Sequence, residues 1–192
     1  MMSTSPAWRV ALEGALDHGR HSPETRYVQV ATVRPDSCPA NRTLVFRAFL
    51  DPGHQLVFTT DLRTAKVTYF ETNPGTEACW YFVLSREPFR IACRAMVCAQ
   101  DGETEKARAR LRAWQEMSDD SRQAFTWPTP GGSRAVLHEF ARAAGNEPPP
   151  QLALWITEAQ EVDHLELRQR PHQRTIHLVA LEGEWLATAI NP

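Results

Sequence analysis

Cations and hydroxyl groups gather along one stretch of the chain, and their chemistry suits the binding of an anion. Arg42 opens a strand-like segment, and Arg47 follows five residues later. Arginine binds phosphate and carboxylate groups through its fork of N–H donors. More cations and hydroxyls lie where a strand gives way to a helix, namely Thr59, Thr60, Arg63, Thr64 and Lys66. The free N–H groups of a helix start also attract anions, so this connection is a candidate phosphate site.

The same residue types also suit an ordinary solvated connection between a strand and a helix, and the residues alone leave both interpretations open. Side chains five residues apart in a straight strand point to opposite faces. Arg42 and Arg47 therefore share one task only if their strand bends.

Several familiar catalytic patterns are missing from the sequence. There is no GxGxxG or Walker-type loop, which excludes Rossmann and P-loop nucleotide sites. His138-Glu139 begins an HExxH-like string, but position 142 is an arginine, and there is no GxSxG nucleophile elbow. The seven histidines are scattered and the four cysteines form no CxxC pair. We therefore expect no metal site, and no residue stands out as catalytic.

The elements that must position the candidate residues are mostly strands. Apolar spacing predicts a helix over 6–19, and a short helix over 62–72 follows the hydroxyl cluster. Alternating or β-branched runs predict early strands at 25–34, 42–50, 55–60, 76–85 and 89–99, and late strands at 152–158, 162–168, 174–181 and 183–190. Further helices are predicted at 102–117, 119–126 and 133–144. Short connections indicate a mainly β fold, a β-barrel with flanking helices. We expect one domain over 1–192 with a helical and loop excursion at about 102–150.

Composition excludes several classes of protein. A chain of 192 residues buries roughly 70% of the surface that it exposes when unfolded, so it needs no metal or disulfide to be stable. The net charge of −2 argues against non-specific nucleic-acid binding. No apolar run approaches the ~20 residues that span a bilayer, and the N-terminus does not read as a signal peptide. Four unpaired cysteines suit the reducing cytoplasm.

One ordered set of strings resembles the pyridoxamine-phosphate oxidase-like family of FMN-binding split barrels: RTLVFRAFL, then LVFTTDLRTAK, then NPGTEACWYFVLSREPFRI. That family has an Arg-x-[hydrophobic]₃-[Lys/Arg] strand, a strand that ends in Thr and a Ser/Thr-x-Lys helix start. The resemblance covers residues 25–100 well and extends loosely to Glu184-Trp185 and Asn191-Pro192. It implies an FMN-binding split barrel that forms a homodimer with one FMN per subunit at the interface.

Carried over position by position, the resemblance implies a role for each candidate. Arg42 matches an arginine that contacts the phosphate and ribityl groups, and Arg47 matches a basic position near flavin and substrate. The strand whose backbone faces the flavin ring holds Thr43, Leu44 and Val45. The pair that contacts the flavin is Thr59 and Thr60, and the phosphate-gripping positions are Thr64 and Lys66.

The chain also departs from the family pattern. Ala65 stands where many members have a second phosphate arginine, and Arg63 is the candidate to replace it. Pro88 stands where members commonly have a glutamine that reaches the flavin of the other subunit. In the vitamin B6 oxidases an Arg-x-His pair near the C-terminus holds the substrate phosphate, beside a Trp on the preceding strand. The matching positions here are Arg168 for the Trp, Arg174 for the Arg and Ile176 for the His, so only the arginine is kept.

The excursion adds candidates of its own. The string from Ser121 to Gly131 places Arg122 and Trp127 in a proline-rich loop, which suits a cap over a flavin and a substrate pocket. The alternative is a surface loop whose aromatic side chains pack on the barrel. The candidate substrate-binding residues are therefore Arg122, Trp127, Arg168 and Arg174.

These observations favour a cytoplasmic, FMN-dependent oxidoreductase that acts on a small molecule. A pyridoxamine or pyridoxine 5'-phosphate oxidase is one alternative, and a non-catalytic flavin-binding or interaction module is another. We expect a homodimer with no nucleic-acid or membrane partner. The substrate and the electron acceptor do not follow from the residues.

Overall fold

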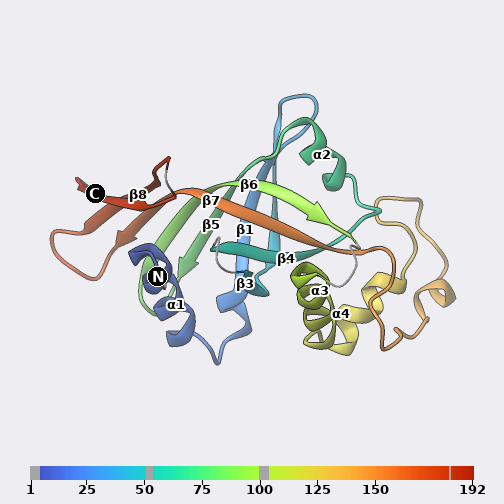
Figure 1. Cartoon of the computed structure of the whole chain (residues 1–192). Coiled ribbons are helices and arrows are strands. Elements are labelled where there is room, and N and C mark those ends of the chain that lie inside the picture. Colours follow the sequence, from blue (N-terminus) through green and yellow to red (C-terminus); the bar gives the residue numbers. More distant parts are fainter. Residues whose placement is uncertain (1–4, 51–53, 100–103, 182) are drawn as a thin grey trace.

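A computed structural model describes residues 5–50, 54–99, 104–181 and 183–192. In these ranges nine strands form one curled sheet flanked by helices (Figure 1). The strands are β1 (Tyr27–Val33), β2 (Pro39–Val45), β3 (Ala48–Leu50), β4 (Gln55–Asp61), β5 (Gly75–Phe82), β6 (Glu87–Cys98), β7 (Leu152–Glu166), β8 (Gln173–Val179) and β9 (Trp185–Ile190). The α-helices are α1 (Ala7–His18), α2 (Lys66–Thr72), α3 (Glu105–Gln115) and α4 (Asp119–Gln123). The prediction of a mainly β barrel with flanking helices is confirmed.

The sheet curls because one bent segment serves both of its edges. Its strand order is β2-β1-β5-β6-β7-β4-β3, with β8 on β7 and β9 on β8. The segment predicted as one strand over 42–50 is two strands, β2 paired with β1 and β3 paired with β4. At the break, the Phe46 N–H donates to the Arg26 carbonyl at 2.8 Å and the Arg47 N–H donates to the Val57 carbonyl at 2.9 Å. Backbone groups at the bend thus keep partners while the chain changes neighbours.

Two strands predicted at 152–158 and 162–168 are one strand, β7. The polar residues between them lie on its exposed side. The pairing of β6 with β7 shifts between Ala92 and Cys93, whose partners are Glu161 and Ala159, so Gln160 is the extra residue of a β-bulge. The length of β7 lets it pair with β6, β4 and β8, and it links the two halves of the sheet.

Two predicted helices are shorter than the sequence pattern indicates. Of 133–144, only a 3-10 turn forms, at Leu137–Phe140. Val136 and Leu137 remain exposed there, so the segment has no apolar face to bury and no packing to extend a helix. The predicted helix 62–72 begins only at Lys66. Asp61 accepts hydrogen bonds from the backbone of Arg63 and Thr64, and this local turn takes the place of the first helical residues.

Two apolar cores lie on the two faces of the β4–β7 pair. Inside the curl, Phe58, Trp80 and Trp155 pack together, and Trp8 of α1 closes one end beside Trp185, with ring centroids 5.2 Å apart. On the outer side of β4 and β7, a smaller core packs against α3. Burying a large apolar side chain stabilises the fold by about 1.5–3 kcal/mol, so these cores fix the sheet on which the candidate residues sit. Among the described residues, no helix is both long enough and apolar enough to cross a membrane.

Candidate functional site

Arg42 lies on the inner face of the curled sheet. It pairs with Val30 across β1 and β2, and Val30 is part of the interior core. The guanidinium donates from Nη1 to the Thr32 hydroxyl at 2.7 Å and to the Val30 carbonyl at 3.4 Å. Its Cζ atom is 5.9 Å from the ring centroid of the fully buried Trp155. Burial lowers the pKa of Arg42, yet an arginine stays charged at any physiological pH.

Lys66 begins α2, the helix that covers the same end of the curl (Figure 1). Its side chain is half-buried. Burial lowers the pKa of Lys66, and the nearby positive charge of Arg42 lowers it further. Arg42 and α2 also meet at one ring, since the Arg42 Cζ lies 5.9 Å from the Trp155 ring centroid and Phe70 of α2 packs on that ring with centroids 4.5 Å apart. The structure therefore brings together two of the predicted phosphate residues, which lie 24 positions apart in the sequence.

Among the described side chains, no carboxylate forms an ion pair with either of these two cations. Asp61 is the acid that raises the pKa of Lys66, but this effect is smaller than those of burial and of Arg42. Its carboxylate is already held by Arg63 through two contacts, Nε to Oδ1 at 3.0 Å and Nη2 to Oδ2 at 2.6 Å. An uncompensated charge in a partly buried position is costly, so these two cations are candidates for binding an external anion.

Arg63, the candidate to replace a second phosphate arginine, is engaged in contacts within the chain. Besides Asp61, it donates to the carbonyl of Trp127 at 2.8 Å and to that of Phe125 at 3.3 Å. It thus ties the excursion to the end of β4. The neighbouring Thr64 hydroxyl donates to the Asp61 carbonyl at 2.7 Å, which leaves its lone pairs available as acceptors.

The remaining predicted residues divide between the two faces of the sheet. Leu44 faces the interior core, while Thr43 lies on the opposite, exposed side, where its hydroxyl accepts from Gln29 at 2.8 Å. Val45 alternates to the side of Thr43. Arg47, at the bend, is half-buried, and burial lowers the pKa of its guanidinium, as does the positive charge of Arg26, while Glu116 opposes this shift.

The two threonines at the end of β4 also face opposite ways, since side chains alternate along a strand. Thr60 follows the register of Phe58 toward the interior and is buried, and its hydroxyl has no partner in the described part of the chain. Thr59 is half-buried and alternates to the side of Val57, which packs toward α3.

Comparison with known proteins decides the family. Residues 5–99 match a family model described as "Pyridoxamine 5'-phosphate oxidase, FMN-binding domain". The chain is 32% identical over 191 residues to pyridoxine/pyridoxamine 5'-phosphate oxidase 2 of Arabidopsis thaliana, with 96% of each protein covered. The chain belongs to the pyridoxamine 5'-phosphate oxidase-like family of FMN-binding proteins.

Two solved structures agree with the fold. A pyridoxamine 5'-phosphate oxidase-related, FMN binding protein from Nostoc punctiforme PCC 73102 is 40% identical and superposes with a TM-score of 0.90, covering 98% of this chain and all of that one. PhzG from Burkholderia lata 383, solved with tetrahydrophenazine-1-carboxylic acid, shares the fold at a TM-score of 0.78 and 15% identity, with 99% and 95% covered. The expected split barrel and the family resemblance are confirmed.

Of the predicted substrate residues in the excursion, Arg122 lies in α4 and Trp127 directly follows the 3-10 turn at Ala124–Thr126. Arg122 pairs with Asp119 and lies 6.0 Å from the ring of Trp114. Trp127 is 40% exposed and meets the edge of Phe140 at 5.8 Å. It lines a groove of about 510 Å³, together with Arg63, Arg142, Pro149 and Gln151. The loop thus presents an aromatic ring beside the Arg63 anchor.

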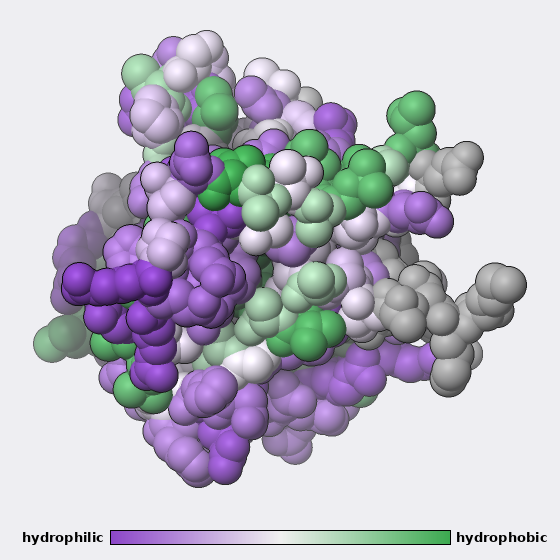
Figure 2. Space-filling view, turned by 90° about the vertical axis from the view of Figure 1, so that its left-hand side faces the viewer, coloured by the Kyte–Doolittle hydropathy of each residue, from purple (hydrophilic) through white to green (hydrophobic). Residues whose placement is uncertain are grey.

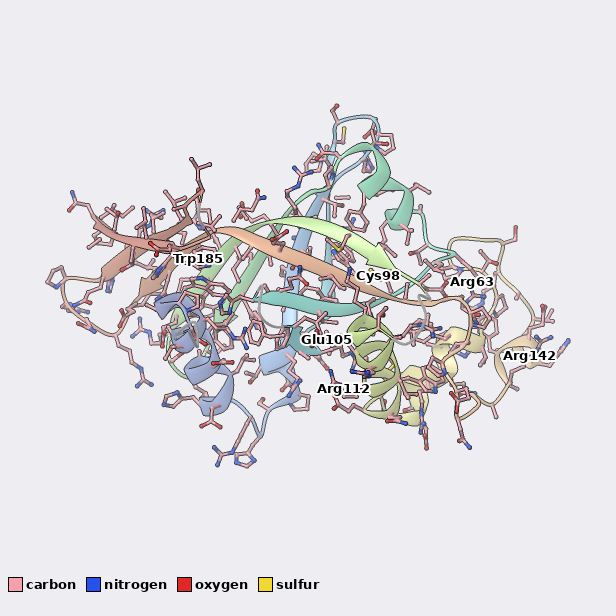
Figure 3. The ribbon with its side chains drawn as sticks, in the orientation of Figure 1. Arg63, Cys98, Glu105, Arg112, Arg142 and Trp185 are labelled. Carbon is pink, nitrogen blue, oxygen red and sulfur yellow. The ribbon has the colours of Figure 1, made fainter. Side chains whose placement is uncertain are left out.

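The other two predicted substrate residues lie at the opposite end of the molecule. Figure 3 shows Arg63 and Arg142 at one end and Trp185, the first residue of β9, at the other. Arg168, just after β7, donates to the Leu84 carbonyl. Arg174 on β8 binds both oxygens of Asp163 at 2.9 and 2.8 Å. Within one chain, Arg168 and Arg174 do not meet Arg42 and Lys66.

Arg174, the residue that the resemblance matches to the substrate-binding arginine of the vitamin B6 oxidases, is held by Asp163. Arg90 also pairs with Asp163. Hydrogen bonds from Arg174 and then from Arg90 lower the pKa of Asp163, so its carboxylate is charged. Ile176 pairs directly with Asp163 across β7 and β8 and offers no donor.

Sequence reasoning missed two residues of the anion site, Thr32 and Trp155. Alternation along their strands places both on the inner face, and this signal is present in the sequence. Their contact with Arg42 depends on how β1, β2 and β7 close around the curl, which no local pattern encodes.

Proposed function

We propose that this protein binds FMN and acts as an FMN-dependent oxidoreductase. One observation carries the proposal: Arg42 and the helix that begins at Lys66 meet at the Trp155 ring, and both cations are half-buried and without a carboxylate partner among the described residues. A phosphate group carries nearly two negative charges at neutral pH, and hydrogen bonds between charged partners are roughly twice as strong as neutral ones. The residues present therefore fit the phosphate of FMN.

In this proposal each element has a distinct part. Arg42 and Lys66 hold the phosphate, with Thr64 and Thr60 as neighbouring hydroxyls. The backbone of β2 at Thr43 to Val45 borders the flavin ring, as in the family. Bound FMN supplies the redox chemistry of the flavin ring, while the protein supplies binding, orientation and electrostatics. Arg63 is a support for the loop rather than a replacement for the second phosphate arginine.

Cofactor titration tests this assignment. Arg42→Ala and Lys66→Ala should each weaken FMN binding at least about tenfold, because each removes a charged partner of a dianion from a partly desolvated site. Arg108→Ala is the control, since Arg108 is exposed on α3. Calorimetry of the FMN-free protein gives the affinities, and flavin absorption bands report loading. Equal affinities for the three variants and the wild type would show that the phosphate site is wrong.

We also propose that the working form is a homodimer. The hairpin of β8 and β9, here called the C-terminal hairpin (173–190), exposes apolar side chains, with Leu186 at 59% exposure. Figure 2 views this end of the molecule, where apolar groups interrupt a mostly hydrophilic surface. Contiguous apolar surface on a soluble protein commonly marks an interface. A second copy would also allow Arg168 and Arg174 of one subunit to approach the flavin site of the other.

A second candidate function is oxidation of pyridoxamine or pyridoxine 5'-phosphate, which the name of the Arabidopsis relative favours. The pairing of Arg174 with Asp163 and the alkyl side chain of Ile176 disfavour it. A flavin carrier without catalysis is a third, and a turnover assay with FMN-loaded protein separates it from both enzymes.

All four cysteines are free thiols, which supports a cytoplasmic location.

A further inference from the structure

Two side chains outside the predicted set hold the guanidinium of Arg42 in one place. The Thr32 hydroxyl accepts from Nη1 at 2.7 Å and donates to the Ala40 carbonyl at 3.4 Å, so its own orientation is fixed. The indole of Trp155 lies 5.9 Å from Cζ, within range of a cation–π interaction. A free arginine side chain has high rotamer entropy, and a contact that restricts it beforehand reduces the entropy lost when a ligand binds.

Trp155 also supports the helix that carries the second cation. Phe70 of α2 packs against the Trp155 ring, with centroids 4.5 Å apart and the rings at 63°. Phe70 follows Lys66 by four residues, so both lie on the same face of α2. The fully buried indole of Trp155 therefore lies beside Arg42 and, through Phe70, also supports the helix that carries Lys66.

We propose that Thr32 and Trp155 are positioning residues for the phosphate group of FMN: Thr32 fixes the direction of the Arg42 guanidinium, and Trp155 fixes the spacing between the two cations. This inference rests on the proposed function. It goes beyond it by assigning phosphate recognition to a hydroxyl and an indole that need not touch the cofactor. If these residues had a purely structural role, substituting them would change the free energy of unfolding without changing the preference for a ligand that carries a phosphate.

The experiment compares FMN with riboflavin, which has the same ring and ribityl chain but no phosphate. Affinities of both for the FMN-free full chain give a ratio that reports phosphate recognition. Thr32→Val removes the hydroxyl and keeps the shape, and it should lower FMN affinity about three- to tenfold while riboflavin affinity stays the same. Trp155→Phe, with a smaller and weaker cation–π partner, should lower the ratio as well. Thr32→Ser keeps the hydroxyl group and should therefore keep the wild-type ratio of the two affinities.

Thr76→Val is the matched control. Thr76 pairs with Thr32 across β1 and β5 and is buried, but its hydroxyl has no partner among the described residues. It should leave the ratio unchanged. The proposal is overturned if Thr32→Val keeps the wild-type ratio while Arg42→Ala lowers it. If Arg42→Ala also keeps the wild-type ratio, the assignment of the phosphate site to Arg42 and Lys66 is wrong. Should Trp155→Phe fail to fold by circular dichroism, Thr32→Val decides alone.

Discussion

At the scale of single residues, Lys66 has a property that an exposed lysine lacks. Burial and the charge of Arg42 both lower its pKa. A bound phosphate opposes this shift, because a nearby negative charge favours the protonated amine. FMN binding should therefore depend on the protonation of the Lys66 amine. This dependence should begin at a lower pH than it would for a lysine with an ordinary pKa.

The resulting prediction concerns pH. As pH rises above the lowered pKa of Lys66, the free protein loses the proton that phosphate binding requires, so FMN affinity should fall by up to about tenfold per pH unit. Lys66→Arg should bind FMN with no such slope, because arginine keeps its charge. Calorimetric titrations from neutral pH to pH ~9.5 measure both curves. Parallel curves for wild type and Lys66→Arg would exclude Lys66 as a phosphate ligand.

At the scale of elements, local patterns predicted most helices and strands but not the places where tertiary contacts override them. The helix 6–19 and the hairpins around 51–54 and 86–88 follow from apolar spacing and turn residues, although 51–53 lie outside the described residues. The bend at Phe46 and Arg47 does not, because it is fixed by carbonyls of Arg26 and Val57 that are distant in sequence. The proximity of Arg42 and Lys66 depends on the same closure of the sheet.

The excursion gives a second example of an element fixed from a distance. Its turn at Phe125 to Trp127 is anchored by Arg63, which Asp61 orients. Asp61 is buried, so loss of its charge is not compensated by water. The sequence indicated the loop and its aromatic residues, while the contacts of Arg63 explain how the loop is attached to the end of β4.

We therefore predict that Asp61→Asn loosens the excursion without unfolding the sheet. The amide keeps the shape but loses the charged contacts with Arg63, so hydrogen exchange at 124–130 should accelerate on the order of tenfold. Asp36→Asn is the control, because the Arg34–Asp36 pair is exposed and contributes little. Mass spectrometry of exchanged peptides measures the effect. Unchanged exchange at 124–130 would show that other contacts hold the loop.

At the scale of the whole molecule, the two sets of candidate residues lie at opposite ends of one chain. Arg42 and Lys66 are at the end covered by α2, whereas Arg174 belongs to the C-terminal hairpin (Figure 1). Apolar side chains are exposed on this hairpin and near the turn between β5 and β6, where Val83 is 72% exposed. A two-fold dimer would cover these surfaces and bring the two ends together.

Light scattering tests the dimer. At micromolar concentration we expect a mass of about 43 kDa, twice the chain mass of 21.7 kDa. Leu186→Glu should shift the mass toward the monomer, because it places a charge in the apolar surface of the hairpin. Arg108→Glu on α3 serves as the control. A mass near that of one chain for the wild type would reject the dimer.

The last prediction concerns substrate, and it depends on both ends of the molecule. We expect little or no oxidation of pyridoxamine 5'-phosphate by FMN-loaded protein. Each hydrogen-bond donor removed from a phosphate-binding site costs about 1–3 kcal/mol of binding free energy. About 1.4 kcal/mol corresponds to a factor of ten in rate. Ile176 offers no donor, and the Arg174 guanidinium already donates to both oxygens of Asp163, so two such losses combine.

Asp163→Asn sharpens this test, since it frees Arg174 and Arg90 while preserving the shape of the site. If Asp163 prevents Arg174 from binding the substrate phosphate, the Asp163→Asn variant should oxidise pyridoxamine 5'-phosphate faster than the wild type. Aldehyde formation in air is the measurement. Wild-type turnover on the order of 0.1 per second or faster, which approaches ordinary enzyme rates, would mean that Arg168, Arg174 and the partner subunit rebuild a phosphate grip in another geometry. The chain would then share the activity named for its Arabidopsis relative.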